Sequence, residues 1–326
     1  MRVAIARSVS IRALLSRADG SDAEIDLGDV TSRRIKQDEL LWVDVFDPTE
    51  DEAGVVRKAL KLTEESEKAF TSPPSEPAAR VLEDGVEVVV LALGDELGTD
   101  PVPLQILIGD GWVITHHRDE IGYLDEHRES VQDQREVGRL TPVEFLASVL
   151  DWHVNSFFDA AEQLEREVDE LDDAALRTER NLLDRLVAMR RRIARVRRVI
   201  AAHNEVAAEL SRPDFMPERA QHGLDALAAV AKRLARAADA VSNAREMLIG
   251  TFDVHMTRTA QRTNDTMRVL TLVSVILLPS VVLAGVMGMN FKVGVFENPN
   301  LFWVVVGAML AMAAATLVVA RWRRWL

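Results

Sequence analysis

Residues 264–291 read NDTMRVLTLVSVILLPSVVLAGVMGMNF, and this stretch decides the fold of the chain. Between positions 269 and 289 it carries no charged side chain, and its polar side chains are the hydroxyls of Thr271, Ser274 and Ser280. A helix needs about 20 apolar residues to cross ~30 Å of hydrocarbon. The stretch therefore predicts a first transmembrane helix at residues 268–289.

A second apolar run, at residues 301–320, follows after a short loop at residues 290–300, and the chain ends in a basic tail at 321–326. These features predict a hairpin of two spans. Arginines stand just before the first span and just after the second, so the positive-inside bias places both termini in the cytoplasm. We expect a multi-pass protein of the plasma (inner) membrane, with only the loop outside.

Residues 1–140 predict a cytosolic α/β domain. Five apolar runs rich in β-branched residues are typical of strands, and they lie at 2–6, 40–46, 86–93, 104–108 and 112–115. Thr49 and Glu52 form a capping-box pattern that opens a helix ending near Leu60. The domain contains no glycine-rich phosphate loop, HExxH or GxSxG motif, so we expect no enzyme.

From residue 141 the pattern becomes helical. The region 141–216 is acidic at 162–173 and rich in arginine at 185–198. We interpret the arginines as a counter-face to the acid, with contact to anionic lipid as the alternative and cation attraction as a further role for the acid. A last helix begins near Pro217 and meets no proline before Pro279, roughly sixty residues or ~90 Å. Its part at 217–267 predicts a cytosolic stalk.

Composition excludes several classes of protein. The net charge of −13 argues against binding of nucleic acid, which requires a basic face. The absence of cysteine excludes a disulfide scaffold, a cysteine zinc finger and a cysteine nucleophile. The first ten residues, MRVAIARSVS, lack a long apolar core, so we expect no signal peptide and insertion directed by the hairpin.

Four further elements accompany this topology. The tripeptide Gly288-Met289-Asn290 ends the first span, Asn264 stands before it, Leu278-Pro279 lies in mid-span and Trp325-Leu326 ends the chain. On these residues the chain resembles the CorA-type divalent-cation transporters of the CorA/ZntB superfamily, over nearly its full length. The resemblance implies a funnel-shaped homopentamer with one axial pore, the second spans outside, and a ring of Asn290 that binds a hydrated cation.

Helical spacing independently gathers one polar and small-residue stripe on the last helix. Because polar groups in a span turn inward, we expect this stripe to line the pore, with ordinary helix packing as the alternative. The predicted pore-lining residues are Asn264, Met267, Leu270, Thr271, Ser274, Leu278 and Val281. A possible cytosolic mouth is formed by Asp253, Thr257 and Gln261. The tripeptide 288–290 has its own alternative, a simple helix C-cap.

Two positions and one stretch of the stalk depart from the family pattern. Val281 stands where many relatives have threonine, and Lys292 stands where an acidic residue is common. Attraction of cations to the mouth therefore rests on Glu297 and Asn290. Only Asp225 and Asp239 supply acid to the stalk between 223 and 240, so the family's regulatory magnesium site has no clear place.

The sequence thus favours passive transport of Mg²⁺, with Co²⁺ and Ni²⁺ as further candidates and no cofactor beyond the transported ion. One alternative is a ZntB-like Zn²⁺ transporter coupled to protons. Another is a membrane-anchored sensor or scaffold that transports nothing. The expected partners are four further copies of the chain, the lipid bilayer and divalent cations.

Overall fold

The computed structural model describes residues 10–17, 19, 22–30, 35–36, 38–94, 97, 99–133, 140–177, 179, 181–212, 215, 221–289 and 300–322. The chain divides into two compact units. We call residues 1–174 and 179–251 the α/β unit, and residues 175–178 and 252–326 the apolar unit. Each unit is described by itself.

A seven-stranded sheet forms the centre of the α/β unit, in the order β2-β1-β3-β7-β6-β5-β4. Neighbouring strands are antiparallel except β3 and β7, which are parallel. The strands are β1 (Ile11–Arg17), β2 (Asp22–Glu24), β3 (Glu39–Phe46), β4 (Ala78–Val81), β5 (Val86–Ala92), β6 (Val102–Ile108) and β7 (Trp112–His117).

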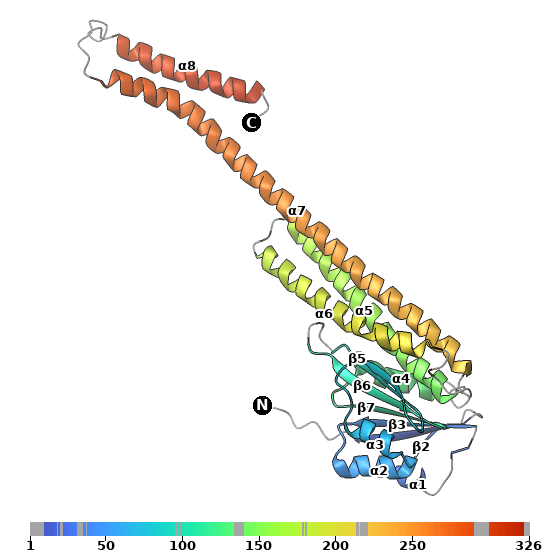
Figure 1. The fold of residues 1–326 in the computed structure, drawn as a ribbon. Helices are drawn as coiled ribbons and strands as arrows, with labels where there is room; N and C mark the ends of the chain where they lie inside the picture. Colours follow the sequence, from blue (N-terminus) through green and yellow to red (C-terminus); the bar gives the residue numbers. More distant parts are fainter. Residues whose placement is uncertain are drawn as a thin grey trace. The chain divides into compact units, whose positions relative to one another are not determined.

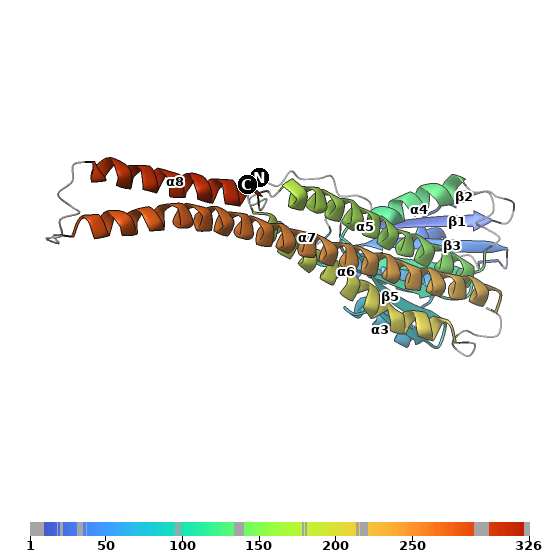
Figure 2. The same ribbon diagram turned by 90° about the horizontal axis from the view of Figure 1, so that it is seen from above.

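Helices cover both faces of this sheet (Figure 1). One face carries α1 (Leu27–Val30), α2 (Glu50–Leu60) and α3 (Glu64–Thr71). The other carries α4 (Gly122–Asp133), α5 (Pro142–Arg177), α6 (Leu182–Leu210) and the first part of α7 (Gln221–Met287). Figure 2 shows α5, α6 and this part of α7 running side by side.

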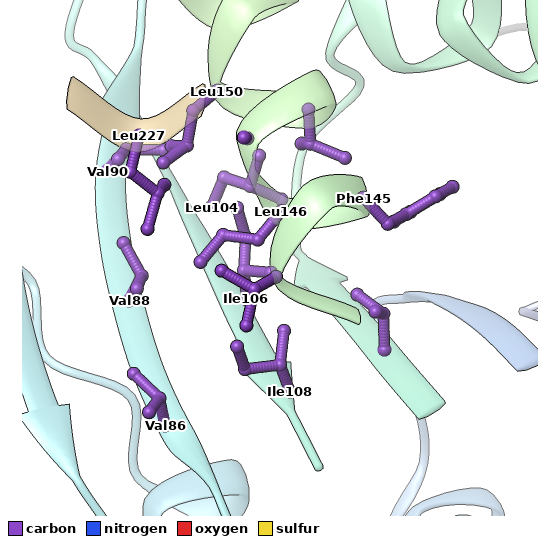
Figure 3. Packing of buried hydrophobic residues seen from close by; sticks show 14 of the residues in the cluster. Val86, Val88, Val90, Leu104, Ile106, Ile108, Phe145, Leu146, Leu150 and Leu227 are labelled. Carbon is purple, nitrogen blue, oxygen red and sulfur yellow. The ribbon is translucent and has the colours of Figure 1, made fainter. Parts of the chain in front are cut away.

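Alternation along the strands divides the core into two layers, as the period of two in a strand requires. Val86, Val88 and Val90 of β5 point to the long helices, where they meet Leu146 and Leu150 of α5 (Figure 3). The layer on the opposite face of the sheet consists of the side chains of β3 and β7 that point away from the long helices, together with the apolar sides of α2 and α3. The long helices are therefore fixed on the sheet by a continuous apolar layer.

Local chemistry explains the ends of several elements. The Thr49 N–H donates to Glu52 Oε2 at 2.8 Å, and the Glu52 N–H donates to Thr49 Oγ1 at 3.3 Å, which is the reciprocal pair of a capping box. Gly111 adopts a φ of +84° in the turn between β6 and β7, a conformation that favours glycine. The Gly109 N–H closes this turn by donating to the Trp112 carbonyl at 3.0 Å.

In the α/β unit, α7 packs along a seam that repeats every seven residues. Leu227, Leu234, Val241 and Leu248 are buried at one position of the repeat. Ala237, Ala244 and Thr251 are buried at a second. Alternating steps of four and three residues are typical of packing between long helices, so α7 is joined to α5 and α6 as in a coiled coil.

A buried ion cluster lies at the ends of β3 and β7. Asp44 accepts a hydrogen bond from Thr115 Oγ1 at 2.6 Å and pairs with Arg128, while His117 Nε2 lies 3.3 Å from its Oδ1. Burial alone would raise the pKa of Asp44, but contact with His117, the Thr115 hydroxyl and Arg128 holds it below its usual value. Burial alone would lower the pKa of His117, but Asp44 raises it. The cluster is therefore stabilised in its charged form.

The apolar unit contains the rest of α7 and α8 (Leu301–Trp322). Both helices are long and apolar enough to span a membrane, with mean hydropathy of 2.6 and 2.3 over their most apolar windows. Both views show α8 running beside the end of α7 (Figures 1 and 2). The hairpin of two apolar helices is as the sequence predicted.

Candidate ion path on the last two helices

The end of α7 has one side turned to α8 and one side left bare. On the first side Leu272, Ile276 and Leu283 are partly buried, and α8 offers a matching row of partly buried residues, namely Val305, Met309, Ala313 and Thr316. Two residues further along the helix from Ile276, Leu278 is 67% exposed. Because two residues turn a helix by ~200°, these two side chains point in opposite directions.

The bare side is the stripe that the sequence predicted to line the pore. Met267, Leu270 and Val281 are 57%, 59% and 66% exposed. Thr271, Ser274 and Gly285 are exposed as well. In a single chain the stripe therefore has no covering element among the described residues, and its assignment to a pore stays a prediction.

The two hydroxyl groups of the stripe use their hydrogens within α7 and leave their oxygens free to accept. The Thr271 hydroxyl donates to the Met267 carbonyl at 2.7 Å, and the Ser274 hydroxyl donates to the Leu270 carbonyl at 2.9 Å. Each hydroxyl has one hydrogen and two lone pairs, so these oxygens face outward as acceptors. An acceptor surface suits a cation with its water shell, because the bound waters present their hydrogens outward.

The glycines at the end of the stripe are not required by the chain's own packing. A Cβ added at Gly285 would meet no atom within 4 Å, and one at Gly288 would meet only backbone oxygens, the nearest 3.3 Å away. Gly288 also lacks the positive φ of a left-handed C-cap. Glycine inside a helix costs about 1 kcal/mol relative to alanine. Open space at Gly285 favours close approach by another chain or by an ion.

The end of α7 is tied by two backbone hydrogen bonds. The Gly288 N–H donates to the Ala284 carbonyl at 2.9 Å, and the Met289 N–H donates to the Val286 carbonyl at 3.2 Å. Met289 is 53% exposed. Asn290, Lys292 and Glu297, which the sequence places at the outer mouth, lie outside the described residues.

The polar end of the stripe is exposed throughout. Asp253, Thr257, Gln261 and Asn264 all have exposed side chains on α7. Between positions 269 and 289 the sequence holds no charged or imidazole side chain. Over the part of the chain that the structure describes, no three His, Asp or Glu side chains gather as metal ligands. The path therefore offers oxygen acceptors but no tight chelating site.

The charged helices pair only in part. Arg192 of α6 pairs with Glu167 of α5 and donates from Nε to the Leu97 carbonyl at 2.8 Å, and Arg185 lies 3.3 Å from Glu179. The interpretation as a counter-face to the acidic run 162–173 holds for Arg192, whereas Arg185 pairs with an acid outside that run. Sequence reasoning missed three large apolar residues that α7 exposes, Met247, Ile249 and Met256. Their signal was an apolar side chain within an otherwise polar stretch.

A sequence profile of the family described as "CorA-like Mg2+ transporter protein" matches residues 37–321. The chain belongs to this family. The match runs from the central sheet of the α/β unit through both apolar helices, so it covers the stripe and the whole tripeptide 288–290.

Relatives within and near the CorA family agree with this assignment. The cobalt/magnesium transport protein CorA of Thermotoga maritima is 28% identical over 209 residues, which cover 62% of this chain and 58% of that protein. The protein of the same description in Methanocaldococcus jannaschii is 22% identical, and the alignment covers 94% of this chain and 97% of the relative.

Solved structures show the same fold. The complete structure of the CorA magnesium transporter from M. jannaschii matches with a TM-score of 0.81 at 20% identity, covering 98% of this chain and 99% of that one. The cytoplasmic domain of ZntB from Vibrio parahaemolyticus matches with a TM-score of 0.61 at 9% identity, covering 77% and 98%. At such identities the likeness concerns the fold alone.

Proposed function

We propose that this protein transports divalent cations, Mg²⁺ foremost and Co²⁺ or Ni²⁺ as well, through an axial pore lined by α7. The observation that carries the proposal is the bare stripe opposite α8, in a chain of the CorA-like family. The two relatives described as cobalt/magnesium transport proteins support the choice of ions.

One chain cannot enclose a pore, so the proposal includes a homopentamer. Five copies of α7 would turn their stripes toward a common axis, with α8 on the outside against lipid. This arrangement covers the exposed Leu278 and Val281 without moving α8. It also explains why Gly285 has open space around it in one chain, because small residues allow helices to approach closely in a membrane.

The chemistry of the stripe favours passage of a cation that keeps its water. Mg²⁺ dehydrates reluctantly and usually retains several waters, so acceptor oxygens suffice to hold it briefly. Thr271 and Ser274 supply such oxygens, and the amide of Asn290 would supply a ring of them at the mouth. Conduction requires binding weak enough for release, which the lack of fixed charge in the span provides.

Residues of the same stripe would form the gate, and the membrane potential would supply the energy for transport. A collar formed by Met267, Leu270 and Leu278 would close the path by dewetting when it is narrow. A negative potential inside, worth about 2.3 kcal/mol per charge per 100 mV, drives a dication inward without another energy source. The proposed orientation has both termini in the cytoplasm and the loop at 290–300 outside the plasma or inner membrane, and it assigns the chain no enzymatic activity.

The test is metal-by-metal flux through the purified chain in liposomes. Asn290→Ala should abolish most flux while leaving the oligomer intact. An unchanged flux would support a membrane anchor instead.

A second candidate is proton-coupled Zn²⁺ transport, which the fold of the ZntB domain favours. It predicts flux that depends on a pH gradient, and it would replace the first candidate if Zn²⁺ alone moved and only with such a gradient.

A further inference from the structure

A pair of histidines is buried where the sheet meets the long helices. His153 of α5 and His203 of α6 are 2% and 3% exposed, and their Nε2 atoms lie 3.3 Å apart. His153 Nδ1 lies 3.0 Å from the Tyr123 hydroxyl on α4. His203 Nδ1 lies 2.7 Å from the Val199 carbonyl, and the Leu91 N–H of β5 donates to His203 Nε2 at 2.9 Å. Four elements of the fold therefore meet at two rings.

The direction of each hydrogen bond follows from the partners. A carbonyl only accepts, so His203 carries its hydrogen on Nδ1 and its Nε2 accepts. His153 must then donate from Nε2, which leaves its Nδ1 to accept from Tyr123. Every hydrogen in the group is used once, and both rings are neutral.

The role of His203 follows from the length of β4. That strand pairs with β5 only from Val86 to Val89, so the edge of β5 beyond it lacks a strand partner. The Leu91 N–H points to this edge rather than to β6, and a backbone N–H left without a partner there would destabilise the fold. The ring of His203 therefore accepts the hydrogen bond that a neighbouring strand would otherwise accept from this edge of β5.

An added proton has no place in this arrangement. On His203 it would occupy Nε2, which already faces two donors, the Leu91 N–H and His153 Nε2. Burial lowers the pKa of His203 to about 4. Burial, and then repulsion from His203, lowers the pKa of His153 well below its usual value. In the closed arrangement both rings therefore stay neutral at a pH at which the same rings would bind a proton in water.

None of the described groups that hydrogen-bond to the two rings carries a charge, and Asp151 of α5, two residues before His153, is paired with Arg233 of α7. Tyr123 is the titratable group from α4, where burial raises the pKa of its hydroxyl, and β5 contributes only the Leu91 N–H. A cavity of about 30 Å³ lies beside the rings, and α7 lines it with Leu227, Val230, Ala231 and Leu234, all apolar. Water that hydrates a charged ring there must enter between the sheet and α7.

We propose that His153 and His203 form a proton-sensitive latch, which holds β5, α5 and α6 together beside α7 at neutral pH and releases this contact in acid. α7 is one continuous helix from Gln221 to Met287, so the latch lies beside the helix that carries the proposed pore stripe. Its effect on transport rests on the proposed function, whereas its release does not.

Hydrogen exchange on the full chain in nanodiscs tests the latch. Between pH 7 and pH 5.5, a ring of ordinary pKa ~6.5 when open and ~4 when closed makes opening about eightfold more frequent. After correction for the intrinsic pH dependence of exchange, we expect this acceleration in peptides from β5, from 199–206 and from 227–234. The double variant His153→Gln/His203→Gln keeps a donor and an acceptor without a titrating ring, and it should lose the acceleration.

His116→Gln is the matched control. His116 is also buried with a pKa lowered to about 4, chiefly by burial, but it packs on Phe70 at the opposite face of the sheet. It should leave the acceleration at α6 and α7 intact. Acceleration that persists in the double variant overturns the latch. If that variant does not fold, wild type alone decides, because acceleration that is absent or uniform over the sheet also overturns it.

Flux measured at equal pH on both sides of a liposome tests the effect on transport. Wild type should change its flux between pH 7 and pH 5.5, and the double variant should not. Equal pH dependence in both proteins overturns the regulatory role. A chain that conducts no cation would contradict the proposed function and leave the exchange result standing.

Discussion

Two leucines on the same helix allow a sharp test of which side of α7 faces the proposed pore. Leu278 is 67% exposed on the bare stripe, and Leu283 is partly buried on the side turned to α8. We predict that Leu278→Asn raises cation flux and that Leu283→Asn instead weakens the hairpin. The same chemical change, five residues apart, should have two separate effects.

The magnitudes follow from the surroundings of each side chain. An amide at 283 would lie against α8 in hydrocarbon, and a buried amide without a partner costs about 1–3 kcal/mol. An amide at 278 would meet little of its own chain and would hydrate the collar. If the collar's barrier falls by ~1.4 kcal/mol, flux rises about tenfold.

The assay is Mg²⁺ flux into liposomes, with the oligomer and its melting followed on the same samples. Wild type and Val273→Asn serve as references, because Val273 is 45% exposed but lies off the predicted stripe. A rise in flux for Leu283→Asn, with none for Leu278→Asn, would show that α7 is turned the other way and refute the assignment of the stripe.

Three further predictions concern the α/β unit. Phe145→Ala removes a ring that is 1% exposed and packs on Trp42, so the free energy of unfolding in denaturant should fall by ~3–5 kcal/mol. Thr49→Ala removes the N-cap of α2 and should lower the stability of this helix by about 1 kcal/mol. The loss should be seen as faster hydrogen exchange in the first turn of α2. His117→Gln tests the buried cluster. Because the pKa of His117 is raised in the folded state, its stabilisation is full below pH ~6.5 and is lost as pH rises through the folded value. The difference in unfolding free energy between wild type and this variant should therefore shrink from pH 6 to pH 8, and a growing difference would contradict the assigned ion pair.

The spacing of apolar residues predicted the long helices and the buried strands, because burial of one side of an element requires apolar residues at regular intervals. The chain is helical in α5, α6 and α7, as expected from residue 141 onward, and strands were correctly expected at β3, β5, β6 and β7. The strand expected at residues 2–6 lies outside the described residues. The strands β1, β2 and β4 were missed because short or polar strands such as Asp22–Glu24 lack a run of β-branched residues. Their position is set by pairing with neighbours, which a single sequence does not display.

The candidate path shows the same limit. The stripe on α7 followed from helical spacing, and the structure adds that α8 covers the other side. The pair of His153 and His203 left no trace in the sequence, because its members are fifty residues apart on two different helices. Pore lining by Asn264 and Met267 also stays a prediction, since it depends on copies of the chain that one sequence and one structure do not contain.

The hydroxyl groups of α7 have a mechanical consequence. Thr259, Thr263, Thr266, Thr271 and Ser274 each donate to the carbonyl four residues earlier, at 2.7 to 3.0 Å. A carbonyl that accepts a second hydrogen bond loosens its helical one, and such back-bonding bends helices slightly. Pro279 removes one further helical bond nearby. This part of α7 can therefore bend slightly at each of many positions. A change in the width of the proposed pore would then appear as gentle curvature along the helix rather than as a bend at one hinge.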